Sequence, residues 1–362
     1  MVGGSCCQLC FCILTPGSVF APDGGIKVNE SVERWMSRAL DLAILGLGRT
    51  GTNPIVGAVL VRDDVLLGEG HHEAAGGPHA EINALIQAGE LARGSSLFVT
   101  LEPCAHFGRT PPCVEAIISA GVKEVFIAAL DPNPIAAGGV AQLENAGIRV
   151  QIGTQRERAL WENRAWRHWI ANNRPYVIWK VAASIDGRIA AADGSSRWIS
   201  GQESRRDVHA IRGASHAIIT GTGTVLRDDP DLSVRDGSNR VPLRVVVGER
   251  EISTDAKIFS GPQQTLVVRN RSPQHLIDEL NSRQVVQAML ECGPRMAARW
   301  LEDNAIDELV IYIAPILLGG GPALFSDLKF ASIRDKQELQ LHDVARFDSD
   351  LRITYTTKSW EV

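Results

Sequence analysis

A histidine, a glutamate and two cysteines in the first third of the chain constrain its fold more than any other sequence feature. The segment contains His79-Ala80-Glu81, then Pro103-Cys104, then Cys113. One imidazole and two thiolates are ligands that zinc takes, and the glutamate is left as a further functional group. Structural zinc sites normally use four protein ligands, so a set of three predicts a catalytic zinc with one position open to water.

The residues around the ligands predict where each of them lies. His79 precedes a run with helical spacing over residues 80–88, so we expect it at a helix start. An apolar run over 96–101 predicts a buried strand that ends shortly before Cys104. A second helical run begins at Cys113. The motif therefore predicts two helix starts and one strand end that converge on a metal ion.

The position of Glu81 indicates the reaction. Zinc deaminases use a glutamate that is not a metal ligand to move a proton from the water to the leaving ammonia. The short deaminase pattern has two residues between its cysteines, whereas eight separate Cys104 from Cys113 here, and this loop is long enough to contact a substrate. Alternatively, the cysteines and the histidine are unrelated core residues. Their order and helix context favour the metal site.

Composition sets the broad class of protein. A chain of 362 residues, 44% of them hydrophobic, can form about two domains. The net charge of −5 argues against a nucleic-acid partner, which would require a basic surface. No apolar run approaches the roughly 20 residues that span a bilayer. We expect a cytoplasmic protein that acts on a small molecule and binds neither nucleic acid nor a membrane.

The first 30 residues differ from the rest of the chain. They are rich in Cys, Gly and Pro, and Cys6, Cys7, Cys10 and Cys12 lie close together. The absence of an early positive charge makes them a poor secretory signal. We interpret residues 1–30 as a flexible N-terminal extension. A second metal site formed by the clustered cysteines is the alternative, although two well-separated pairs are missing.

Alternating strand and helix patterns predict two α/β units. A helix over 32–46 and two strands joined at Asp63-Asp64 open a mixed sheet covered by helices, and a charged, Trp-rich segment follows as a connecting helix. A second unit begins with a strand over 175–184. Its further strands are expected over 217–220, 243–247, 265–268, 285–290 and 308–313.

Several longer motifs resemble the bifunctional deaminase-reductases of riboflavin biosynthesis. The matching segments are 53–59, 76–81, 100–104, 108–113 and 131–134 in the first half, and 180–187, 198–199, 224–225, 228–230 and 232–235 in the second. The resemblance implies a cytidine-deaminase-like α/β/α sandwich followed by a dihydrofolate-reductase-like α/β domain. It implies zinc-dependent deamination of 2,5-diamino-6-(5-phosphoribosylamino)pyrimidin-4-one, then reduction of the ribosyl group to a ribityl chain. The implied cofactors are Zn²⁺ and NADPH.

The resemblance also implies a division of the chain. We expect the deaminase domain over 31–153, a linker helix over 154–173 and the reductase domain over 174–362. We further expect a homo-oligomer, for which the sequence specifies no number of subunits.

The family pattern assigns residues to each reaction. For deamination it implies His79, Cys104 and Cys113 as zinc ligands, Glu81 as the proton shuttle, and Asn53, His106, Asp131 and Asn133 as substrate contacts. For reduction it implies cofactor contacts from Ala182, Trp198, Thr224, Asp228 and Gly293. It implies substrate contacts from Lys180, Asp186, Ser196, Arg212, Leu232, Arg235 and Glu291. Arg212 and Arg235 are suited to bidentate binding of a phosphate ester. A turn residue or a solvated surface arginine is the alternative in each polar case.

Three positions depart from the family pattern. Gly138-Gly139 is one residue shorter than the usual Gly-x-Gly, and Cys292 replaces a usual glycine. Gly248-Glu249 stands where the family often has Asp-Ser. A carboxylate near the ribose 2′-phosphate would repel it, so we expect a weaker preference for NADPH over NADH.

Two other classes of function share some of these features. A deaminase that acts on RNA would carry the same zinc motif, and tight, salt-sensitive RNA binding would identify it. A degenerate nucleotide-binding or oligomerisation module is the non-enzymatic interpretation of residues 174–362. Saturable NADPH binding would exclude that interpretation.

Overall fold

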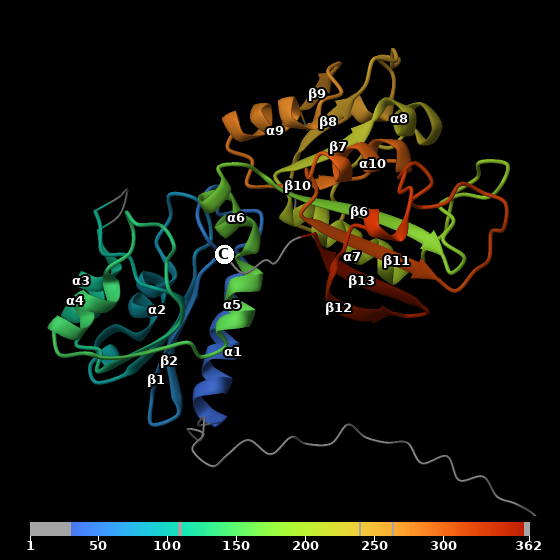
Figure 1. The fold of residues 1–362 in the computed structure, drawn as a ribbon. Helices are drawn as coiled ribbons and strands as arrows, with labels where there is room; N and C mark the ends of the chain where they lie inside the picture. Colours follow the sequence, from blue (N-terminus) through green and yellow to red (C-terminus); the bar gives the residue numbers. More distant parts are fainter. Residues whose placement is uncertain (1–29, 108–110, 239, 263, 358–362) are drawn as a thin grey trace, which may run out of the picture.

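A computed structural model describes residues 30–107, 111–238, 240–262 and 264–357. Within these residues the chain forms a five-stranded and an eight-stranded sheet, joined by two short helices (Figure 1). The expected N-terminal extension lies outside the described residues, apart from Glu30, at which the first helix begins. Among the described helices, none combines the length and the apolar character needed to cross a membrane.

The first sheet is mixed, as predicted. Its elements are α1 (Glu30–Ile44), β1 (Gly57–Arg62), β2 (Val65–His71), α2 (Ala80–Ala88), η1 (Gly89–Ala92), β3 (Ser96–Leu101), α3 (Cys113–Ser119), β4 (Glu124–Ala129), α4 (Gly139–Asn145) and β5 (Arg149–Ile152). The strand order is β2-β1-β3-β4-β5, in which β1 runs antiparallel to both neighbours and β3, β4 and β5 are parallel. The predicted turn at Asp63-Asp64 is present, with both residues at positive φ.

Helices cover both faces of this sheet because its strands are apolar on both sides. In β3, the buried Leu97 and Val99 pack with residues of α2, α3 and α4. Phe98, which points to the opposite face, packs with residues of α1 and α5. This alternation confirms the α/β/α sandwich. The parallel strands β3 and β4 end at the same edge of the sheet, where the metal-ligating residues follow.

The connecting segment is two helices, so the expected single helix over 154–173 is wrong. α5 (Arg156–Glu162) and α6 (Arg164–Asn172) are separated at Asn163. The buried amide of Asn163 makes two hydrogen bonds of 2.9 Å with the backbone of Ile55, accepting from its N–H and donating to its carbonyl. The break thus positions a side chain that holds the loop before β1.

The second sheet contains every strand expected in this half. Its elements are β6 (Tyr176–Ser184), α7 (Gln202–Ala214), β7 (Ala217–Gly221), α8 (Thr222–Asp228), β8 (Leu243–Val247), η2 (Lys257–Phe259), β9 (Thr265–Val268), α9 (Pro273–Ser282), β10 (Gln287–Leu290), α10 (Pro294–Glu302), β11 (Glu308–Ala314), η3 (Ile333–Asp335), β12 (Gln340–Phe347) and β13 (Asp350–Thr356). The order is β12-β13-β11-β6-β10-β7-β8-β9. The β12–β13 hairpin was not predicted.

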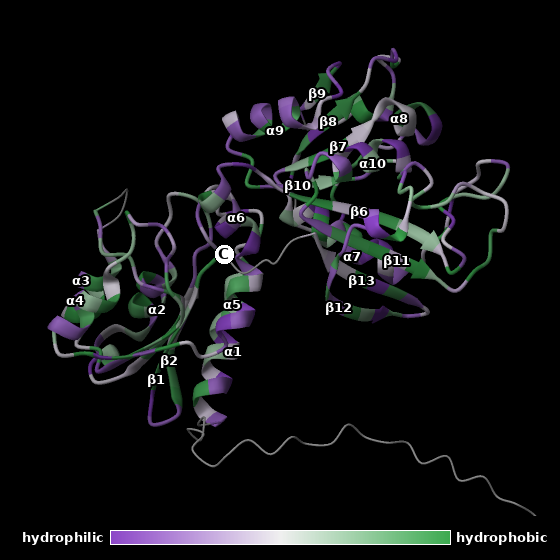
Figure 2. Ribbon diagram, in the orientation of Figure 1, coloured by the Kyte–Doolittle hydropathy of each residue, from purple (hydrophilic) through white to green (hydrophobic). Residues whose placement is uncertain are grey.

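The core of the second unit also lies on both faces of its sheet. Val177 and Trp179 of β6 pack with residues of α9 and α10, whereas Ile178 packs with Val208 of α7. Figure 2 shows apolar residues concentrated in the strands and mixed with polar residues along the helices. The six strands from β11 to β9 are parallel, so their carboxyl ends lie along one edge. Ligands of open α/β sheets bind at such an edge.

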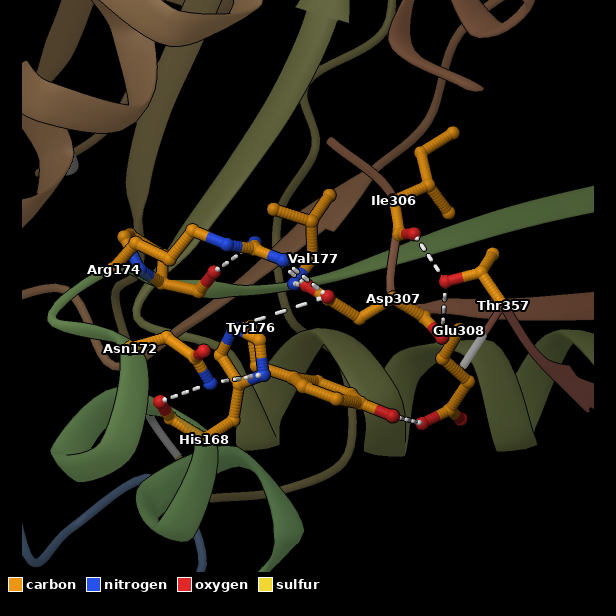
Figure 3. A network of polar contacts seen from close by, with 10 residues as sticks. His168, Asn172, Arg174, Tyr176, Val177, Ile306, Asp307, Glu308 and Thr357 are labelled. Atoms are coloured by element: carbon orange, nitrogen blue, oxygen red, sulfur yellow. Dashed lines mark hydrogen bonds and ion pairs between the residues drawn. The ribbon is translucent and has the colours of Figure 1, made fainter. Parts of the chain in front are cut away.

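A buried polar network fixes the connecting helices to the second sheet. The Glu308 carboxylate accepts hydrogen bonds from Arg164 Nε at 2.6 Å and from the Tyr176 hydroxyl at 3.0 Å. Asp307 accepts from both terminal nitrogens of Arg174, at 2.5 and 2.9 Å (Figure 3). Because Arg164 begins α6, this network couples the orientation of the connecting helices to β6 and β11.

Candidate active sites

The three predicted metal ligands meet at one edge of the first sheet. His79 caps the start of α2, Cys104 follows β3 and Cys113 begins α3. Their ligand atoms all lie within 4.8 Å of one another. His79 Nδ1 is 3.2 Å from Cys113 Sγ and 3.6 Å from Cys104 Sγ. Zinc bound tetrahedrally by nitrogen at about 2.0 Å and sulfur at about 2.3 Å separates those two atoms by roughly 3.6 Å. The cluster therefore fits a zinc ion.

The charge state of the cluster is also suited to a cation. A hydrogen bond from the Cys113 thiol, together with His79, lowers the pKa of the Cys104 thiol to about 4. The backbone N–H of Cys113 also points at Cys104 Sγ, at 3.4 Å. These contacts favour the thiolate form of Cys104, which is the form that ligates zinc.

Glu81 lies beside the cluster without belonging to it. Glu81 lies on the first turn of α2 and is 3% exposed. It is not one of the three residues whose ligand atoms meet. Burial raises the pKa of Glu81 above its ordinary value. A carboxyl group that can hold and release a proton nearer neutral pH is suited to general acid and base catalysis.

Asn53 is linked to the metal-ligating His79 through His72, a residue that the sequence interpretation missed. Asn53 Nδ2 is 3.1 Å from Nε2 of His72, and His72 Nδ1 is 3.1 Å from the carbonyl oxygen of Pro78. The His72 ring stands edge-on to the His79 ring, with centroids 5.4 Å apart. His72 directly follows β2, and this position at a strand end was the available signal. Asn53 also lines a small pocket of about 40 Å³, whose lining includes Trp166, His216 and Gln287.

The other predicted contacts follow the ends of β3 and β4. Burial raises the pKa of Asp131, whose carboxylate accepts a hydrogen bond from the Asn133 N–H at 2.8 Å. Nδ1 of His106 is buried and has no hydrogen-bond partner among the described residues. Asp131 and Asn133 belong to one turn. One of the hydrogen bonds that the Asp131 carboxylate can accept is therefore formed within this turn.

Glu102 fastens this turn to the metal-binding strand, and it was also missed. The carboxylate is 7% exposed. It accepts hydrogen bonds from the N–H groups of Gly138 and Val140, both at 3.1 Å, and of Asp131 at 3.3 Å. Glu102 therefore holds the segment after β4 against the end of β3, two residues before the Cys104 ligand. The residue acts by positioning the turn.

The second sheet brings Lys180, Arg212 and Glu291 together. Arg212 Nε and Nη2 donate to the two Glu291 oxygens at 2.5 and 2.8 Å. Burial raises the pKa of Glu291, but Arg212 and Lys180 outweigh burial and lower it to about 2. Burial lowers the pKa of Lys180, and Glu291 partly restores it. The bidentate fork of Arg212, expected to face a phosphate, is directed at Glu291 instead.

Arg235 and Leu232 lie on the segment after α8. Arg235 forms an ion pair with Asp231 and donates from Nε to Ser233 Oγ at 3.1 Å, while its guanidinium stays largely exposed. Leu232 is 3% exposed and packs in the core with Val225. A substrate contact from Leu232 would therefore involve its backbone.

The carboxylate of Asp186 is hydrogen-bonded to the turn after β11. Its carboxylate accepts from the N–H groups of Leu318 at 3.1 Å and Gly319 at 2.8 Å, and from Ser184 Oγ at 2.5 Å. The hydrogen bond from Ser184 is the largest of the effects that lower the pKa of Asp186 to about 2. Its role in the structure is to hold the Gly-rich turn in place.

The predicted cofactor contacts lie on several elements of the second unit. Ala182 is in β6, Trp198 is in the segment before α7, Thr224 and Asp228 are in α8, and Gly293 caps α10; Ser196, predicted as a substrate contact, lies in the same segment as Trp198. Trp198 is 71% exposed, and the Arg205 guanidinium lies 4.6 Å above its ring. Thr224 and Gly293 follow the adjacent ends of β7 and β10.

Two family models match complementary parts of the chain. The zinc-binding region of cytidine and deoxycytidylate deaminases matches residues 29–129. The RibD C-terminal domain matches residues 175–353. The first match contains the three ligands and Glu81, and the second contains the Lys180, Arg212 and Glu291 cluster.

Curated relatives and solved structures match both parts together. The riboflavin biosynthesis protein RibD of Mycobacterium tuberculosis is 42% identical over 339 residues, covering 92% of this chain and 99% of the relative. RibD of Aquifex aeolicus is 37% identical over 353 residues, covering 91% and 99%. The structure of Acinetobacter baumannii RibD aligns with a TM-score of 0.81 at 39% identity, covering 90% and 99%. A diaminohydroxyphosphoribosylaminopyrimidine deaminase/5-amino-6-(5-phosphoribosylamino)uracil reductase from Thermotoga maritima aligns at 0.84 with 32% identity and the same coverage.

Proposed function

This chain belongs to the RibD family of riboflavin biosynthesis proteins, and on that premise we propose which of its residues carry out each of its two reactions. It is a zinc-dependent deaminase and an NADPH-dependent reductase. The observation that carries the assignment of the deaminase site is the convergence of His79, Cys104 and Cys113 beside the buried Glu81. We assign the deaminase to residues 31–153 and the reductase to residues 174–362.

The deaminase substrate is a diaminohydroxyphosphoribosylaminopyrimidine, the compound named for the Thermotoga maritima protein. His79, Cys104 and Cys113 would hold the zinc ion, which would supply a Lewis acid to activate water for attack on an amino-bearing ring carbon. Glu81 takes the proton from that water and delivers it to the departing ammonia. Its burial and raised pKa support this role, because the group must hold the proton between the two transfers.

Polar side chains around the cluster position the pyrimidine. Asn53 contacts His72, whose ring adjoins that of the ligand His79, and this proximity supports Asn53 as a contact to the pyrimidine. The free Nδ1 of His106 and the carboxylate of Asp131 supply further partners for polar groups of the substrate. Asn133 supports the Asp131 turn and is the fourth contact in this assignment.

The reductase substrate is the deaminated phosphoribosylamino compound. Residues at the ends of β6, β7 and β10 would hold NADPH, which would supply a hydride for C1 of the opened ribosylamino group. Lys180 donates a polar contact at the reacting end, and the nearby charge of Glu291 favours its protonated form. Arg212 fixes Glu291 by a bidentate ion pair and thereby acts as a positioning residue.

Further contacts in the reductase are assigned by position. Arg235 has the most exposed guanidinium of this site and is the partner that we assign to the substrate phosphate. Asp186, Ser196 and the backbone of Leu232 complete the substrate side. The cofactor side is formed by Ala182, Trp198, Thr224, Asp228 and Gly293.

Replacing Lys180 by Met tests the separation of the two sites. We expect the rate of NADPH oxidation with deaminated substrate to fall about a hundredfold, because a positioned polar group is lost at the reacting end. Ammonia release from the first substrate should be unchanged. The exposed Lys329→Met variant is the matched control and should retain both activities. A parallel loss of ammonia release in Lys180→Met would contradict two independent sites.

A homo-oligomer and a cytoplasmic location complete the proposal. Three exposed apolar side chains support contact between subunits at the edge of the second sheet: Leu341, Val344 and Leu351, which are 60, 52 and 42% exposed. Exposed apolar residues on an edge hairpin are commonly covered by another chain. Light scattering on the purified protein measures the number of subunits.

A further inference from the structure

Three arginines and one glutamate lie in the segments that follow β8 and β9. Glu249 follows β8, and Arg271 Nη2 lies 3.3 Å from its carboxylate. Arg269 Nη1 points at the Glu249 carbonyl oxygen at 3.4 Å. Among the described residues, no carboxylate forms an ion pair with Arg250, the residue after Glu249. We call Arg250, Arg269 and Arg271 the arginine cluster; it carries three positive charges against one Glu249 carboxylate.

The arginine cluster borders the glycine turn at the end of the neighbouring strand β7. Arg250 Nη2 lies 2.6 Å from the point where a Cβ of Gly223 would be, so the absence of a side chain there makes room for the guanidinium. Gly248 has a φ of +138°, and a Cβ added to it would lie 2.4 Å from Oγ1 of Thr222. At the ends of β7 and β8, side chains therefore pack directly against the backbone of glycines. Glu249 and Arg250 lie just after the end of β8.

A similar placement occurs in dinucleotide-binding sheets of the Rossmann type. Where a glycine turn follows one strand, an acid at the end of the next strand bonds the ribose 2′-hydroxyl of NADH, whereas an arginine there accommodates the 2′-phosphate of NADPH. Here both residue types are adjacent in sequence. Glu249 suits the hydroxyl and the arginine cluster suits the phosphate.

We propose that Arg250 and Arg271 bind the 2′-phosphate of NADPH and that Glu249, the ion-pair partner of Arg271, limits this binding because its carboxylate repels the phosphate. The inference rests on the proposed reductase function. Bound phosphate must displace the Glu249 carboxylate from Arg271, and the carboxylate then remains close to a dianion. The ion pair is exposed, at 54 and 65% of the two side chains, so separating it costs little and the repulsion decides the outcome. NADH instead offers Glu249 a hydroxyl donor, so the chain binds both nucleotides.

Dissociation constants of the full-length protein for NADPH and NADH, measured by titration calorimetry, test the inference without relying on turnover. Glu249→Ser should tighten NADPH binding about tenfold and leave NADH binding equal or weaker, since one nearby like charge is removed. Arg271→Ala should weaken NADPH binding by about tenfold with no change for NADH. Both effects should shrink in high salt, because the groups are exposed.

Glu251→Ser is the matched control, since it makes the same charge change at an exposed residue two positions away. It should leave the NADPH to NADH ratio unaltered. An unchanged ratio in Glu249→Ser, or an equal shift in Glu251→Ser, would overturn the inference while NADPH binding itself upheld the reductase. Failure of the unmodified protein to bind either nucleotide would overturn the proposed reductase function and this inference with it.

Discussion

Replacing Glu81 by Gln should lower the rate of ammonia release by roughly a thousandfold, within the range found for loss of a positioned acid and base. The amide keeps the size of the side chain but cannot accept and return a proton. Glu81 is outside the ligand cluster, so the zinc content should remain that of the unmodified protein. NADPH oxidation with deaminated substrate should also be unchanged, because the reductase residues lie on the other sheet.

Glu115→Gln supplies the control for this experiment. Glu115 lies on the first turn of α3 and is exposed, so the same substitution changes one charge near the site without touching the cluster. Its ammonia release should stay within about twofold of the unmodified protein, since exposed substitutions have small effects. A Glu81→Gln protein that released ammonia at a normal rate would exclude Glu81 as the proton shuttle.

Glu308→Ala should destabilise the protein by about 3–5 kcal/mol. Glu308 is 3% exposed and accepts two hydrogen bonds from Arg164, at 2.6 and 3.2 Å. Its removal leaves the guanidinium of Arg164 buried without its carboxylate partner, and the Tyr176 hydroxyl loses its acceptor. Urea unfolding followed by tryptophan fluorescence measures the change, because Trp161 and Trp166 lie on the affected helices.

Two variants sharpen the stability experiment. Glu338→Ala removes a carboxylate from an exposed ion pair with Lys336 and should cost less than about 1 kcal/mol. Arg164→Leu combined with Glu308→Leu should recover much of the lost stability, since it removes both buried charges. A loss below about 1 kcal/mol in Glu308→Ala would mean that solvent reaches Arg164 and that the network does not fix α6.

The deaminase site was the most predictable part of the molecule because its signals are local. His79 and Cys113 are at helix starts, as the following helical spacing indicated, and Cys104 follows the strand that the apolar run over 96–101 predicted. The fold class, both activities and both cofactors are confirmed. The domain boundaries and the individual residue roles stay predictions.

The features that were missed depend on residues far apart in the sequence. Glu102 accepts hydrogen bonds from Gly138 and Val140, which are 36 and 38 residues away, and no local pattern marks such a contact. The break at Asn163 has the same origin, because its amide bonds Ile55, 108 residues away. The strand β12 has no fully buried residue and its polar and apolar residues do not alternate regularly, so it lacks the apolar periodicity that identified the buried strands.

The ion pair between Arg212 and Glu291 also could not be predicted from the sequence. Both were expected to contact substrate, but 79 residues separate them, and their bidentate pairing appears only when α7 packs beside β10. The fork of Arg212 is therefore used within the protein, and the exposed Arg235 is the better partner for a phosphate.

Metal analysis of the purified full-length protein, by mass spectrometry of its elements, tests the central claim most directly. Three ligand atoms within 4.8 Å of one another and a thiol whose pKa is lowered to about 4 predict about one zinc ion per chain. The content should fall toward zero in Cys113→Ser, together with ammonia release. A fully active unmodified protein with no stoichiometric metal would contradict the account.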